Sequence, residues 1–197
     1  MAKVGILGAG SWGTALAILL HDNGHDVIVW SIDPKEVEML SEKREHVSKL
    51  PGVHISEEIM ITNEMEEAIK GKDFLVLAVP SIFTRSTAAK MKPYVVDGQM
   101  IVDVAKGIEE DTLMTLSQQI SQEIPQADVA VLSGPTHAEE VGRGIPTTVV
   151  VGAKNKETAE MLQDVFMNKV FRVYTSSDIV GIELGGALKN VIALAAG

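Results

Sequence analysis

Cysteine is absent from the 197-residue sequence, and basic residues are scarce. The lack of cysteine excludes disulfides, thiolate catalysis and cysteine-ligated zinc sites. Lysine and arginine together number 17 against 27 aspartates and glutamates, which gives a formal net charge of −10. An acidic surface argues against nucleic acids and anionic membranes as partners. It does not exclude a small anionic ligand, because local lysines and backbone N–H groups decide that.

Long apolar runs and metal-binding patterns are also missing. No uninterrupted apolar run reaches the length that crosses a bilayer, and the most apolar stretch, residues 184–196, is broken by Lys189 and Asn190. None of the five histidines has metal-ligand spacing with a carboxylate partner, so no metal is expected. The first predicted strand begins at residue 3, which leaves no room for a signal peptide. We therefore expect a cytoplasmic protein without integral membrane association.

What the sequence does contain is a regular alternation of apolar strands and helical patterns. Its 46% apolar and 22% charged residues are typical of a globular protein. Strands are predicted at residues 3–7, 26–30, 59–61, 74–79, 100–104, 129–132, 147–151 and 171–174. Helices are predicted at residues 12–20, 34–45, 63–70, 82–91, 111–122 and 159–166, with a loop at 50–52. This order predicts an α/β fold of the Rossmann type, with a doubly wound, mostly parallel sheet covered on both faces.

The pattern is helical from Asp178 to the end, and this helix has no single apolar face. Its apolar residues point in several directions, so it needs burial on more than one side. We expect either that the chain is a fragment or that this helix packs against another copy.

The segment from Gly8 to Gly13 places three glycines where a strand turns into a helix, at G-x-G-x-x-G spacing. Gly8 would allow the tight turn, Gly10 would let a pyrophosphate approach the backbone, and Gly13 would let the helix pack close to the strand. The free N–H groups at the helix start would face an anion. In this context the motif predicts a dinucleotide site.

Asp33 follows Gly13 by 20 residues, close to the distance usual for an acid that accepts hydrogen bonds from ribose hydroxyls. It is equally well placed to cap a helix that starts at Pro34. Ile32 carries no charge and so gives no support for binding of the 2′-phosphate of NADP, although Lys35 could supply a positive charge for it. The predicted cofactor is therefore NAD or NADP.

Two lysines are candidates for chemistry. Lys106 follows a predicted strand at the edge where ligands bind in doubly wound sheets, although a solvated surface lysine would look the same. Lys189 lies beyond the pair Gly185-Gly186 in an apolar helix. Burial there would lower its pKa towards that of a usable acid or base, whereas a lysine at a helix end could equally reach water. Thr136 is expected to cap a helix and to leave its hydroxyl free for a ligand.

Five segments resemble the NAD(P)-dependent glycerol-3-phosphate dehydrogenases of bacterial type, in order and over the whole chain. They are residues 8–17, Val79-Pro80-Ser81, Lys106-Gly107-Ile108-Glu109, Ser133-Gly134-Pro135-Thr136 and residues 184–193. The resemblance implies reversible hydride transfer between sn-glycerol 3-phosphate and dihydroxyacetone phosphate, which feeds phospholipid synthesis.

The resemblance also implies roles for individual residues. It places cofactor contacts at Ser11, Trp12, Ile32, Lys106 and Ala138, although the family often has a basic residue where Ile32 stands. It places substrate contacts at Lys106, Gly134, Thr136, Lys189 and Asn190. Lys189 would be the proton acceptor in alcohol oxidation.

Family members continue into a helical domain that supplies further substrate-binding side chains. The resemblance therefore implies a NAD(P)-binding domain at residues 1–177 and, at residues 178–197, the first helix of a truncated all-α substrate domain. Such a chain is expected to form a homodimer and to bind nucleotide but catalyse poorly. Three other hypotheses are a two-domain dehydrogenase for a hydroxy acid or sugar acid, a non-catalytic NAD(P)-sensing module, and a methyltransferase.

Overall fold

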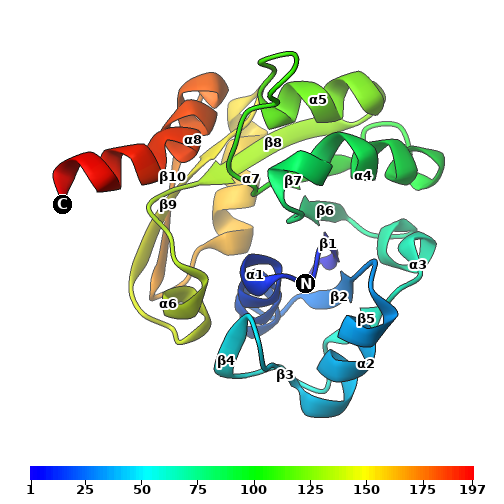
Figure 1. Ribbon diagram of the computed structural model, residues 1–197. Helices are drawn as coiled ribbons and strands as arrows, with labels where there is room; N and C mark the ends of the chain where they lie inside the picture. Colours follow the sequence, from blue (N-terminus) through cyan, green and yellow to red (C-terminus); the bar gives the residue numbers. More distant parts are fainter.

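Eight strands form one sheet in the computed structural model, which describes all 197 residues (Figure 1). Their order across the sheet is β10-β9-β8-β7-β6-β1-β2-β5, and β3 pairs with β4 in a separate hairpin. The strands are β1 (Lys3–Leu7), β2 (Asp26–Trp30), β3 (Glu45–His46), β4 (Leu50–His54), β5 (Met60–Thr62), β6 (Phe74–Leu77), β7 (Met100–Asp103), β8 (Asp128–Ser133), β9 (Thr147–Gly152) and β10 (Phe171–Ser176).

Helices connect the strands and cover both faces of the sheet, so that α4 and α5 lie on one side and α1 and α6 on the other (Figure 1). The α-helices are α1 (Ser11–Asp22), α2 (Pro34–Lys43), α3 (Met65–Ile69), α4 (Thr84–Met91), α5 (Leu116–Glu123), α6 (Ala138–Gly142), α7 (Lys156–Phe166) and α8 (Ile179–Ala196). Two 3₁₀ turns, η1 (Ser81–Phe83) and η2 (Lys92–Tyr94), flank α4.

The apolar runs of the sequence form strands because both faces of each strand are buried. Alternate residues of β1 enter opposite cores: Ile6 packs with α1 and α7, whereas Leu7 packs with α3, α4 and α5. Every strand pair in the sheet is parallel except β8 with β9. The predicted Rossmann-type, doubly wound, mostly parallel sheet is therefore confirmed.

Two local predictions were wrong. Residues 50–52, predicted as a loop, begin β4, which pairs antiparallel with β3. The helix predicted at 111–122 begins only at Leu116, because Leu113 has a φ of 57° and Thr115 forms a capping box with Gln118. A bridge between Ile108 and Thr115 closes the preceding loop. The loop after β7 is therefore held by the Ile108–Thr115 bridge rather than by helical hydrogen bonds.

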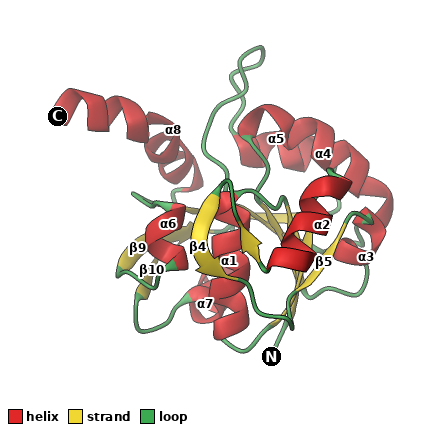
Figure 2. Cartoon of the chain, turned by 60° about the horizontal axis from the view of Figure 1, so that its bottom comes forward, coloured by secondary structure: helices red, strands yellow, loops and turns green.

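Helix α8 lies at the end of the chain, and its C-terminal part stands clear of the other elements (Figure 2). Asp178 caps it through a 2.8 Å hydrogen bond from the Gly181 N–H group. Only Glu183 and Gly186 among its residues are buried. Its 18 residues have a mean hydropathy of 1.6, so by length and composition alone it could cross a membrane, although Glu183, Lys189 and Asn190 interrupt its apolar residues. One such helix is weak evidence, because a core helix of a soluble protein meets the same criterion.

Candidate functional site

A cavity of about 1030 Å³ opens at the carboxyl ends of the strands. Most of its lining comes from the turns that follow β1, β2, β6, β7 and β8, which are residues 8–12, 30–32, 78–81, 104–106 and 136–139. This is the edge at which doubly wound sheets bind ligands. Its volume matches the larger of the small-molecule and cofactor sites of proteins.

The glycine-rich turn is shaped by close backbone contacts. Gly8 has a φ of +120°, and a Cβ atom there would lie 2.7 Å from the Ala78 carbonyl oxygen. A Cβ atom on Gly13 would lie only 1.9 Å from the Gly8 carbonyl oxygen, so the packing of α1 against this turn requires glycine. Gly10 lines the cavity and has nothing within 4 Å of its Cβ position. No side chain caps α1, so the open space and the free N–H groups fit a pyrophosphate.

Trp12 connects this turn to the end of β7. Its indole Nε1 donates a 3.1 Å hydrogen bond to the Val104 carbonyl, and its ring centroid lies 5.7 Å from the Lys106 Nζ atom. That distance is within the range of a cation–π interaction. Ser11 and Trp12 both line the cavity, as do Ile32 and Ala138.

Lys106 and Lys189 meet at Thr136. The Lys106 Nζ donates to the Thr136 hydroxyl at 2.8 Å, and the Lys189 Nζ donates to the Thr136 carbonyl at 3.0 Å. Burial lowers the pKa of Lys106 to about 8, and the nearby charge of Lys189 adds to this effect. Three segments that are far apart in the sequence thus place two amines and a hydroxyl at one point beside the cavity.

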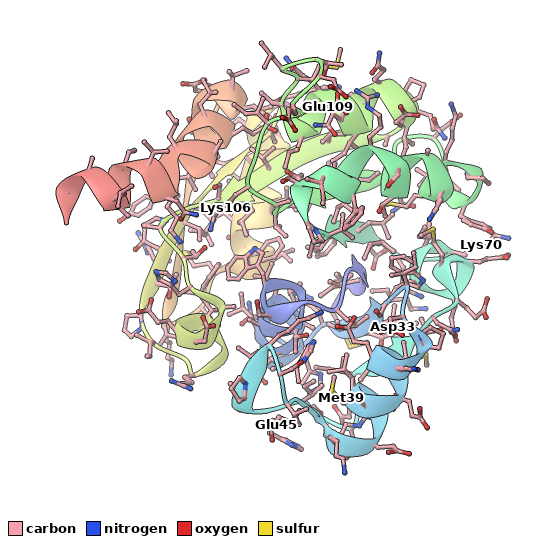
Figure 3. All side chains as sticks on the ribbon, viewed as in Figure 1. Asp33, Met39, Glu45, Lys70, Lys106 and Glu109 are labelled. Carbon is pink, nitrogen blue, oxygen red and sulfur yellow. The ribbon has the colours of Figure 1, made fainter.

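The loop that carries Lys106 is attached to helix α4 by Arg85. The guanidinium donates to both carboxylate oxygens of Glu109, at 2.6 and 2.7 Å, and to Glu123 at 2.8 Å. Hydrogen bonds from Arg85 and Thr112 lower the pKa of Glu109 to about 2. Figure 3 shows Glu109 on this loop, beyond Lys106.

Helix α8 approaches the site through Gly186. A Cβ atom on Gly186 would lie 2.6 Å from the hydroxyl of Ser133, whereas nothing lies within 4 Å of the Cβ position of Gly185. Glu183, one turn earlier, accepts hydrogen bonds from the N–H and hydroxyl groups of Ser117, at 2.8 and 2.7 Å. Gly186, unlike Gly185, thus allows close packing of α8 on β8.

Some predicted site residues lie outside the cavity lining. Asp33 is exposed, accepts a 3.0 Å hydrogen bond from the Lys35 N–H group and so caps α2, well apart from Lys106 (Figure 3). Gly134 packs against β9, since its Cβ position is 2.7 Å from the Thr148 carbonyl oxygen. Asn190 is exposed on α8.

Sequence reasoning missed a group of polar residues at the end of β2. Glu36 lines the cavity and accepts hydrogen bonds from Ser31 Oγ at 2.5 Å, from Lys49 Nζ at 2.6 Å and from His46 Nε2 at 3.0 Å. Burial raises the pKa of Glu36, but these hydrogen bonds outweigh it and leave the pKa below the ordinary value. Lys49 lies in the turn between β3 and β4, just before the predicted loop at 50–52, so no periodic pattern placed it near Glu36.

Comparison with known proteins gives one family. The family model described as the N-terminus of NAD-dependent glycerol-3-phosphate dehydrogenase matches residues 3–159. A glycerol-3-phosphate dehydrogenase [NAD(P)+] of Agathobacter rectalis is 66% identical over 100% of this chain, and one of Fusobacterium nucleatum is 56% identical over 100% of it. The chain spans 59% of the length of each of these relatives.

Solved structures agree with the sequence comparison. The crystal structure of a glycerol-3-phosphate dehydrogenase from Coxiella burnetii superposes with a TM-score of 0.92 at 31% identity. The alignment covers 98% of this chain and 59% of that one. A UDP-D-ManNAc dehydrogenase from Pyrococcus horikoshii, at 13% identity and a TM-score of 0.78, shares the fold alone.

Proposed function

The chain belongs to the NAD-dependent glycerol-3-phosphate dehydrogenase family, and we propose that it forms the cofactor-binding part of an enzyme that interconverts sn-glycerol 3-phosphate and dihydroxyacetone phosphate. The family is NAD(P)-dependent. The observation that carries the proposal is the meeting of Lys106 and Lys189 at Thr136, beside the glycine-rich turn. A methyltransferase would need no such pair of amines, and its ligand has no pyrophosphate.

In this proposal the turn from Gly8 to Trp12 binds the pyrophosphate of the cofactor. Ala138 also lines the cavity, and in this proposal Lys106 reaches both cofactor and substrate. When bound there, the nicotinamide would supply the hydride acceptor for the alcohol and the hydride donor for the ketone. The resemblance assigns substrate contacts to Gly134, Lys189 and Asn190, and none of these three residues is in the cavity lining.

The two lysines have different roles in this proposal. Lys189, as the neutral amine, accepts the proton of the secondary hydroxyl during oxidation, and as the ammonium it returns that proton to the ketone oxygen. Lys106 supplies positive charge for an anionic substrate below a pH of about 8, where it is protonated. The charge of Lys189 contributes to the lowered pKa of Lys106 and so assists loss of a proton from Lys106.

The wider organisation is part of the same proposal. Residues 1–177 form the NAD(P)-binding domain, and residues 178–197 contribute the first helix of an all-α substrate domain that covers the apolar surface of α8. We propose a cytoplasmic homodimer with a small-molecule substrate. The chain by itself is expected to turn over weakly. A dehydrogenase for another hydroxy acid or sugar acid, or a cofactor sensor, is the alternative.

Titration of the purified chain with NADH and NADPH, with and without dihydroxyacetone phosphate, tests this function. We expect saturable binding that Lys106→Met weakens by about tenfold, since the cation beside Trp12 is lost. Lys189→Met should remove any effect of dihydroxyacetone phosphate on binding. Lys154→Met is the matched control, because Lys154 is exposed and outside the cavity lining. Binding of neither cofactor contradicts the proposal.

A further inference from the structure

We propose that Glu36 makes this chain select NAD(H) over NADP(H), by accepting a hydrogen bond from the adenosine ribose and by engaging Lys49. The proposal rests on the cofactor site proposed above and adds its selectivity. It assigns to Glu36 the ribose contact that the sequence spacing offered to Asp33.

Position is the first argument. Glu36 lies in the first turn of α2, directly after β2, and lines the cavity together with Ser31 and Ile32. The end of the second strand is where an acid meets the ribose hydroxyls in dinucleotide-binding folds. Asp33 is turned away from this place, because its carboxylate is used to cap α2.

The geometry of the carboxylate is the second argument. The Glu36 side chain is only 13% exposed and is oriented by three donors. His46 Nε2 and Lys49 Nζ donate to Oε1, and the Ser31 hydroxyl donates to Oε2. A carboxylate has about four acceptor positions, so one on Oε2 stays free for a ribose hydroxyl. Such a pre-oriented acceptor loses little entropy when the ligand binds.

Charge at this end of the cavity is the third argument. Ile32 is 67% exposed and adds no cation, while Lys49 is already paired with Glu36 at 2.6 Å. A 2′-phosphate would stand beside the Glu36 carboxylate and would have to compete with it for Lys49. NADP(H) is therefore opposed by repulsion from Glu36, and Lys35 on α2 is exposed and outside the cavity lining.

A double-mutant cycle tests the inference, with dissociation constants for NADH and NADPH measured on the whole chain. Wild type should prefer NADH. Glu36→Gln keeps an acceptor for Ser31 but removes the charge and releases Lys49, so the NADH preference should fall by about tenfold. In Glu36→Gln/Lys49→Met most of the gain in NADPH affinity should disappear. Thermal unfolding of each variant checks that the fold is kept.

Glu38→Gln is the matched control, because it removes the same charge from an exposed position of α2 outside the cavity lining. Its cofactor preference should stay within about twofold of wild type. A wild-type preference for NADPH, or an unchanged preference in Glu36→Gln, overturns the role of Glu36. A full NADPH gain in the double variant overturns the part assigned to Lys49. If wild type binds neither cofactor, the proposed function itself fails, which is a separate result.

Discussion

The glycine-rich turn lines the cavity and helix α8 reaches Thr136 beside it, but the two elements are stabilised very differently. In α1, which follows the turn, seven of the twelve residues are buried. In α8 only two of the eighteen are. Thr14 is fixed by a 3.1 Å hydrogen bond from its hydroxyl to the Ala9 carbonyl. Helix α8 contacts Ser117 on α5 through Glu183, Ser133 on β8 through Gly186 and the Thr136 carbonyl through Lys189.

This difference separates two parts of the proposed site. The glycine-rich turn is formed by dense packing of backbone against backbone. The catalytic amine of the proposal depends on a helix whose apolar residues Leu184, Leu188 and Val191 are exposed. Changes in the turn should therefore affect folding and cofactor binding strongly, whereas changes in α8 should affect its docking.

The largest expected effect comes from Gly13→Ala. The added Cβ atom would lie 1.9 Å from the Gly8 carbonyl oxygen, and backbone cannot move away cheaply. We expect the free energy of unfolding to fall by about 3 kcal/mol. Urea denaturation followed by circular dichroism measures this change.

Gly10→Ala is the matched control for the turn. Nothing lies within 4 Å of that Cβ position, so stability should change by less than about 1 kcal/mol. The methyl group points into the space assigned to the pyrophosphate, so NADH affinity should still fall. Equal stability of the two variants would contradict the contrast in packing.

In α8 the pair Gly185→Ala and Gly186→Ala gives a smaller effect of opposite sign. Alanine at 185 meets open space and should stabilise the helix by about 0.5–1 kcal/mol. Alanine at 186 would lie 2.6 Å from the Ser133 hydroxyl, and moving that side chain should make the net change about 1 kcal/mol destabilising. Denaturation and limited proteolysis of α8 measure the change in stability caused by each substitution. If both variants are stabilised, α8 is not packed against β8.

Much of the fold follows from sequence because buried parallel strands are continuous apolar runs. Residues 3–7 and 26–30 were predicted with the boundaries that β1 and β2 have. The loop after β7 was not predicted correctly, because its shape depends on Leu113 at positive φ and on the ion pair between Arg85 and Glu109. The spacing of apolar residues along the sequence gives no information about these features.

Some residues of the candidate site could likewise be placed from the sequence, and others could not. Gly8, Lys106 and Thr136 could be placed together, because the carboxyl ends of parallel strands share one edge of the sheet. The choice between two uses of Asp33 could not be made, since it depends on the direction of one side chain. Lys49 and Glu36 are 13 residues apart and meet only because the hairpin of β3 and β4 folds back on α2.

An effect that is confined to neutral pH belongs to the α8 side, because residues 8–13 contain no titratable side chain. Burial raises the pKa of Asp103 at the end of β7 well above its ordinary value of 3.8, and the charge of Glu183 on α8 adds to this. The folded protein therefore keeps a proton that the unfolded chain releases. The contribution of this group to stability is complete below pH 3.8 and is lost as the pH rises towards the folded-state pKa.

Asp103→Asn should consequently raise the free energy of unfolding at pH 7 by about 1 kcal/mol, and should leave it nearly unchanged at pH 3. Asp128→Asn is the matched control, since Asp128 is exposed at the start of β8 and its loss should matter little at either pH. Urea denaturation of the three proteins at both pH values measures the difference. A loss of stability in Asp103→Asn at pH 7 would mean that the carboxyl is ionised and partnered, and the α8 side would then not be the pH-sensitive region.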